Sequence, residues 1–173
     1  MEQTGKANEY REGVTGTTGP WGVRTKTLFR ALRDMAGLDG DTLARMLGLN
    51  GPQWIHRWER DGQKDPPLDA WRIVESFADL HRDQVDAIVR DVAGRDAPRG
   101  TRIDLIYYRS QAEYDAYGRD PGPYGPVDAA VLHAGLLLSQ AGYDVAYVAP
   151  AGLPPVERAA IRMTRDGDAA GKI

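Results

Sequence analysis

Apolar residues recur with a helical period through the first half of the chain. Their spacing predicts one helix over residues 26–36, two short helices joined by a tight turn within residues 41–62, and a long helix over residues 70–93. The apolar stripe of the long helix is spaced alternately by three and four: Trp71, Val74, Ala78, His81, Val85, Ile88 and Val92. Such a stripe suits a helix–helix seam, in the core or between subunits.

In the second half of the chain, the spacing of apolar residues changes from a helical period toward the alternation of a strand. Residues 102–108 partly alternate and are rich in β-forming types, which predicts a strand, and residues 143–148 are interpreted as a second strand. Between them, Ser110 and Glu113 have the spacing of a capping box. They predict a short helix that stops at Gly118.

A proline- and glycine-rich loop is expected over residues 119–126, followed by an apolar helix over residues 128–140. Four residues of that helix are expected to be buried: Val131, Leu132, Leu136 and Leu138. Beyond the second strand, a short charged helix is predicted over residues 156–164.

These elements predict an α+β protein with an all-α N-terminal domain and a small strand–helix–helix–strand C-terminal domain. We expect a disordered arm, a helical domain, an α/β domain, and a short helix with a flexible tail, over residues 1–22, 23–99, 100–150 and 151–173. A sheet of two strands is marginal by itself. We therefore expect the second half to dimerise, with a partner that supplies strands or buries the helix face.

Residues 41–62 carry the clearest functional signal. Gly48 suits the left-handed end of the first short helix, and Pro52 suits the first position of the second. Ile55 and Trp58 are spaced to face the first helix. This is the geometry of a helix-turn-helix, whose second helix lies in the DNA major groove with its N-terminal residues on base edges. The alternative interpretation is a helical hairpin that only stabilises a larger fold.

The outer face of the second helix offers four residues to read bases: Gln53, Trp54, His56 and Arg57. Arginine pairs well with guanine and glutamine with adenine, whereas Trp54 is equally compatible with burial in the core. Five basic residues are candidates for contacts with the DNA backbone: Lys26, Arg30, Arg45, Arg60 and Lys64. Glu59 is expected to pair within the fold.

Composition and charge narrow the classes of protein to which the chain can belong. The net charge of −3 disfavours a general nucleic-acid binder, but residues 21–64 contain eight basic and five acidic residues, a local charge of +3. The chain has no cysteine, which excludes disulfides and thiolate chemistry. It has no apolar run typical of a transmembrane helix or a signal peptide. We expect a cytoplasmic protein without membrane contact, metal or cofactor.

Six positions resemble the repressor-like (Xre/Cro-type) helix-turn-helix superfamily: Ala44, Gly48, Ile55, Trp58, Glu59 and Gly62. More narrowly, residues 54–62 (WIHRWERDG) and 107–118 (YYRSQAEYDAYG) resemble the anti-CRISPR-associated autorepressors and their chromosomal relatives. The resemblance spans residues 24–148, although the turn at residues 65–67 is longer than in that group. It implies a phage-related autorepressor that binds an inverted repeat in double-stranded DNA, with a C-terminal domain that holds a homodimer.

Other functions fit parts of the sequence. One alternative is an antitoxin-type module whose C-terminal half binds a protein partner. Another is a protein whose basic face binds RNA. An enzyme is not expected: residues 136–150 resemble the helix and strand of a dinucleotide-binding fold, but YYRSQ stands where the glycine-rich turn would be. His56, His81 and His133 lack metal-ligand spacing.

Overall fold

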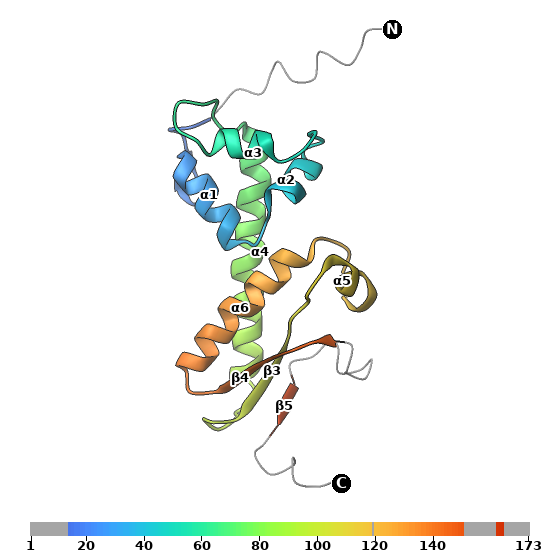
Figure 1. Cartoon of the computed structure of the whole chain (residues 1–173). Helices are drawn as coiled ribbons and strands as arrows, with labels where there is room; N and C mark the ends of the chain where they lie inside the picture. Colours follow the sequence, from blue (N-terminus) through green and yellow to red (C-terminus); the bar gives the residue numbers. More distant parts are fainter. Residues whose placement is uncertain (1–13, 119, 151–161, 165–173) are drawn as a thin grey trace. The chain divides into compact units, whose positions relative to one another are not determined.

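The computed structural model describes residues 14–118, 120–150 and 162–164 (Figure 1) and divides into two compact units, residues 1–79 and 80–173. The elements in chain order are β1 (Thr18–Gly19), β2 (Gly22–Val23), α1 (Lys26–Met35), α2 (Gly40–Met46), α3 (Gln53–Trp58), α4 (Leu68–Ala93), β3 (Arg102–Ile106), α5 (Gln111–Tyr117), α6 (Tyr124–Gln140), β4 (Asp144–Val148) and β5 (Arg162–Thr164). This mixture agrees with the predicted α+β class. Within the described ranges, no helix is long and apolar enough to cross a membrane.

The first unit has one hydrophobic core, formed by the inward faces of α1, α2 and α3 against the first part of α4. Phe29 of α1 meets Trp71 of α4 edge-on, with 5.2 Å between the ring centroids, and both are fully buried. Thr25 caps α1 by accepting a hydrogen bond from the N–H of Leu28, as its place before the helix predicts. Gly48 follows α2 with φ of +66°, which confirms the expected left-handed helix end.

The predicted disordered arm over residues 1–22 is wrong for residues 14–22. Strands β1 and β2 form an antiparallel hairpin, and Val14 and Trp21 pack against the core. The guanidinium of Arg24 donates to both carboxylate oxygens of Glu75 on α4, each at 2.9 Å. This pairing holds the hairpin on the unit, and composition alone does not reveal it. Residues 1–13 lie outside the described residues.

Helix α4 begins two residues before its predicted start and ends where predicted. Its alternating stripe is buried throughout, apart from the half-buried Ile88, so the stripe belongs to the interior of the subunit. The division into two units falls inside α4, at residues 79 and 80, rather than at residue 99. The reason is that Ile88, Val89 and Val92 contribute to the core of the second unit.

His81 lies on the buried stripe of α4 and is only 4% exposed, as expected for a core residue. Its Nε2 atom lies 3.0 Å from Nδ1 of His133 on α6. Burial, and then the charge of His133, lowers the pKa of His81. The two ring nitrogens are therefore within hydrogen-bond distance, with one ring donating and the other accepting.

The second unit contains a three-stranded sheet in the order β4-β3-β5, with β3 parallel to β4 and antiparallel to β5. Strand β3 buries Ile103 and Leu105 against α4 and α6. The third strand corrects the helix predicted over residues 156–164, because residues 162–164 form β5, while 156–161 lie outside the described residues. The open edge of β3 offers backbone hydrogen-bond partners to residues 162–164, and a prediction from local helical spacing does not take such distant partners into account.

Helix α5 confirms the predicted capping box. The hydroxyl of Ser110 accepts from the N–H of Glu113, and the Glu113 carboxylate accepts from the N–H of Arg109. Helix α6 starts at Tyr124 instead of residue 128, so the predicted loop ends earlier. Pro126 is compatible with this start because the first turn of a helix does not use the N–H that proline lacks.

The burial predicted for α6 is correct for Val131 and Leu138 and wrong for two other leucines. Leu132 and Leu136 are 45% and 56% exposed. Helix α6 covers the sheet with the face that carries Val131 and Leu138, and a sequence with so few polar residues does not indicate which face that is.

Asp128 is a buried carboxylate that joins α6 to the chain after β3. It is 4% exposed, and its Oδ1 accepts from the N–H of Tyr108 at 3.0 Å. Its Oδ2 has no hydrogen-bond partner among the described residues. Burial raises the pKa of Asp128 to about 6 from its usual 3.8, although the hydrogen bond from Tyr108 opposes that rise.

We expect Asp128→Asn to remove a pH dependence of stability. Between pH 3.8 and about 6 the folded protein retains a proton that the unfolded chain releases, so the wild-type free energy of unfolding falls as pH rises through this interval. Asparagine keeps the acceptor oxygen but does not ionise. The variant should lack that fall and be more stable at neutral pH by about 1–2 kcal/mol. Urea denaturation across this pH range measures both effects, and equal slopes for the two proteins would contradict them.

Candidate nucleic-acid interface

Helix α3 packs beside α2 and is fixed from its inner face. Ile55 is fully buried and Trp58 is 5% exposed, as their spacing predicts. The starts of the two helices approach closely at Gly40, where an added Cβ would lie 3.2 Å from Cβ of Pro52 and 3.5 Å from Nε2 of His56. A small residue at this point therefore sets the position of the start of α3.

The outer face of α3 gathers three of the four predicted base-reading residues. Gln53, His56 and Arg57 are exposed, whereas Trp54 is half-buried against the core. The guanidinium carbon of Arg57 lies 5.2 Å from the ring centroid of Trp54, a cation–π contact that restricts the arginine. The Gln53 amide donates to the carbonyl of Asn50 and so braces the turn before the helix.

A buried ion pair holds the end of α3 against α1. Arg33 Nε lies 2.6 Å from Oε1 of Glu59, and the two side chains are 12% and 7% exposed. Arg33 also donates to the carbonyl of Leu38. The prediction that Glu59 pairs within the fold is confirmed. Arg33 itself carried no signal in the sequence, because its partner lies 26 residues away in another helix.

Lys26, a sequence candidate for DNA backbone contact, is engaged within the unit. Its ammonium group donates to the carbonyls of Arg60, Gln63 and Lys64 and lies 3.3 Å from the carboxylate of Asp65. The side chain is 13% exposed. Lys26 thus closes the turn after α3, where several unpaired carbonyl groups converge on one cation.

The remaining candidates for DNA backbone contact are exposed: Arg30, Arg45, Arg60 and Lys64. Arg30 pairs with Asp34 one turn along α1 at 3.5 Å. An exposed pair of this kind contributes only about 0.3–0.5 kcal/mol, so it does not prevent the arginine from contacting another anion.

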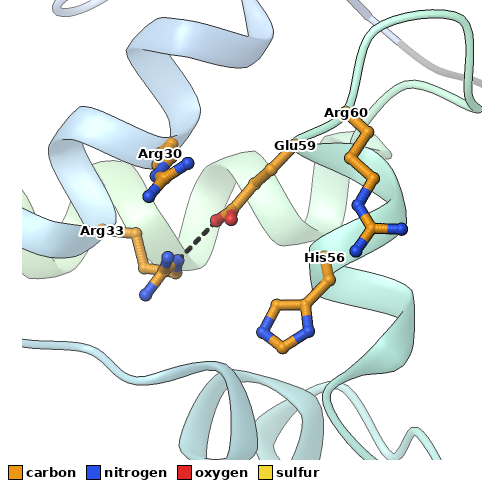
Figure 2. Close-up of a pocket in the computed structure, with 5 residues that line it drawn as sticks. All are labelled: Arg30, Arg33, His56, Glu59 and Arg60. Atoms are coloured by element: carbon orange, nitrogen blue, oxygen red, sulfur yellow. Dashed lines mark hydrogen bonds and ion pairs between the residues drawn. The ribbon is translucent and has the colours of Figure 1, made fainter.

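An open pocket of about 240 Å³ lies between α1 and the end of α3 (Figure 2). It is lined by Arg30, Arg33, His56, Glu59 and Arg60. Arg33 and Glu59 neutralise each other at its wall, while the other two guanidinium groups and the imidazole surround the hollow without a further carboxylate in the lining. Such an excess of cationic N–H donors suits an anion such as a phosphate group. The sequence did not connect these residues because they come from separate helices.

Within the described ranges, no group of three or more histidine, cysteine, aspartate or glutamate residues is placed to hold a metal ion. No protein-family model matches the chain, and a search of curated proteins found no match to it. The geometry and charge of the first unit therefore provide the basis for assigning its function.

We expect Arg33→Met to lower the free energy of unfolding by about 3 kcal/mol, because it leaves the Glu59 carboxylate largely buried without a counter-charge. Arg30→Met is the matched control: it removes an arginine that is 66% exposed on the same helix and should change stability by no more than about 0.5 kcal/mol. The double variant Arg33→Met with Glu59→Met should recover most of the loss. Urea denaturation measures all three, and equal effects of the two arginine variants would refute this role of the pair.

Proposed function

We propose that the first unit is a helix-turn-helix domain, formed by α2, the turn at residues 47–52 and α3, and that the protein is a sequence-specific DNA-binding repressor. The observation that carries the proposal is α3: it is buried through Ile55 and Trp58 and turns Gln53, His56 and Arg57 outward together. In this class of domain the exposed N-terminal side chains of the second helix contact base edges in the major groove.

Arg57 is the principal base reader in this proposal. The planar guanidinium can donate two parallel hydrogen bonds to O6 and N7 of guanine. Its stacking on Trp54 reduces the conformational freedom that binding would otherwise remove. Trp54 then acts as a support for Arg57 more than as a reader, while Gln53 has the donor and acceptor that match adenine.

Phosphate contact is assigned to the rim of the same surface. Arg30, Arg60 and His56 surround the open pocket beside α3, and Arg45 and Lys64 are exposed in the same unit. Each contact to the DNA backbone would add affinity at low salt without specifying sequence. Because the protein as a whole has a net charge of −3, attraction to DNA is confined to this locally basic region.

The protein is proposed to act as a homodimer on an inverted repeat. One short recognition helix reads only a few base pairs, whereas a dimer reads two half-sites about 34 Å apart or a multiple of that spacing. Occupation of such a site within a promoter would block transcription. The resemblance of residues 54–62 to autorepressors suggests the promoter of the protein's own gene as the site.

The test is a fluorescence-anisotropy titration against the duplex upstream of its own gene, beside a scrambled duplex of equal composition, at two salt concentrations. We expect tight binding to the first duplex with two protomers per site, and weak, salt-sensitive binding to the second. Equal, weak binding to both duplexes would overturn the proposed function.

We expect Arg57→Ala to reduce the difference in binding free energy between the specific and the scrambled duplex by about 1–3 kcal/mol, because the bidentate contact to a base is lost. Arg57→Lys is the matched control: it keeps the positive charge and therefore the salt dependence, but it lacks the planar pair of donors and should lose similar discrimination. Thermal denaturation should show both variants folded. If both retain the wild-type affinity ratio, Arg57 is not a base reader.

A further inference from the structure

The second unit exposes a continuous apolar surface on α6 and β4, which we call the leucine face and define as Leu132, Leu136 and Tyr147. These side chains are 45%, 56% and 45% exposed. The Tyr147 hydroxyl lies 3.4 Å from the carbonyl of Leu132, which places the tyrosine beside the helix. Among the seventeen residues of α6 two are acidic or basic: Asp128, which is buried, and His133, whose Nδ1 lies 3.0 Å from Nε2 of His81 on α4. The exposed side of the helix therefore carries no aspartate, glutamate, lysine or arginine side chain.

Strand β4 borders the leucine face and has a free edge. It is the last strand in the order β4-β3-β5, and in the described part of the chain no strand pairs with its outer side. Hydrogen bonds at both ends of the β3–β4 ladder show that residues 144, 146 and 148 turn their backbone groups toward β3. Backbone groups alternate along a strand, so the N–H and C=O of Val145 and Tyr147 point to the free edge.

This edge lacks the features that usually prevent strand pairing. Edge strands commonly carry lysine, proline or inward charges that block a second chain. Strand β4 has the sequence DVAYV, with one charge at its first residue and no proline. An unprotected edge beside an uncharged apolar helix face indicates a surface that another strand and helix cover.

We propose that β4 pairs antiparallel with β4 of a second copy of this chain, around a two-fold axis at Ala146. In this register Val145 lies opposite the partner's Tyr147, and the outward N–H and C=O groups of both residues meet their complements. The two three-stranded sheets become one sheet. Because the axis is perpendicular to the sheet, the α6 helices of both copies lie on the same side, where each leucine face covers the other.

Charge favours a second copy as the occupant. Asp144 lies opposite the partner's Val148, so the register keeps the two carboxylates at opposite ends of the paired strands. The facing sides of α6 bring together no aspartate, glutamate, lysine or arginine side chains. The pairing also matches a short strand with an identical short strand, whereas an unrelated protein would have to supply both a strand and an apolar helix of the same spacing. This inference rests on the proposed function for its need of a dimer, and it names the surface that forms one.

Analytical ultracentrifugation of the full chain without DNA provides the first test. We expect the wild-type protein to sediment as a dimer and Leu136→Glu to raise the dimer dissociation constant by roughly 100-fold, because two carboxylates would be buried within the interface. Val23→Glu is the matched control: Val23 is equally exposed, at 56%, but lies in the first unit, and this variant should remain dimeric. A dimeric Leu136→Glu variant, or a monomeric wild-type protein, would overturn the interface.

Ala146→Cys tests the register. The chain has no cysteine, so this variant would contain a single thiol. Opposed residues that do not exchange hydrogen bonds in an antiparallel pair have Cα atoms about 4.5 Å apart, close enough for a disulfide. Mild oxidation should convert the variant to a covalent dimer, whereas Val23→Cys should stay monomeric on a non-reducing gel. Equal crosslinking of both variants would overturn the two-fold axis at Ala146.

Failure of the interface and failure of the proposed function give different results. A wild-type monomer that still binds a single half-site specifically in the anisotropy titration would overturn the interface and retain DNA recognition. A dimer that is lost in Leu136→Glu but does not distinguish the duplexes would retain the interface and overturn DNA recognition.

Discussion

Burial of one alternating stripe on α4 is the constraint on which both units depend. Trp71 and Val74 close the core of the first unit, and Val85 and Val92 take part in the cores of the second. A fully buried valine contributes about 1.5–3 kcal/mol relative to an exposed one, so each unit derives much of its stability from its own segment of the same helix. The consequence is that the domain boundary is not a linker but a point within a helix.

The basic side chains of residues 21–64 fall into two groups in the first unit, one turned inward and one exposed. Arg24, Lys26 and Arg33 are turned inward and paired with Glu75, backbone carbonyls and Glu59. A desolvated cation requires such partners, and these bonds fix the hairpin, the end of α3 and the turn after it. Three exposed basic residues remain on or beside α3: Arg57 on the helix, and Arg30 and Arg60 at the adjoining pocket. The net charge of residues 21–64 alone therefore overstates the number of basic side chains that are free to contact an anion. The inward-facing pairs also explain why the outer face of α3 has a defined position.

The second unit combines a free strand edge with a helix that exposes leucines. A third strand, β5, completes one side of β3, so a shortage of strands is no longer the reason to expect a partner. The reason is the unprotected outer edge of β4 beside Leu132, Leu136 and Tyr147. In the proposed function, a single short helix that reads DNA would gain specificity from pairing with a second copy, so the two surfaces are complementary parts of one proposed mechanism.

The sequence by itself determined the positions of most of the helices, the cap at Ser110, and the buried stripe of α4, because these depend on local periodicity and hydrogen bonds between near neighbours. It also indicated the outward residues of α3. Only the tertiary structure decided which cations turn inward, which side of α6 is exposed, and that residues 162–164 form a strand. These outcomes depend on contacts between residues far apart in the chain, and such contacts leave no period in the sequence.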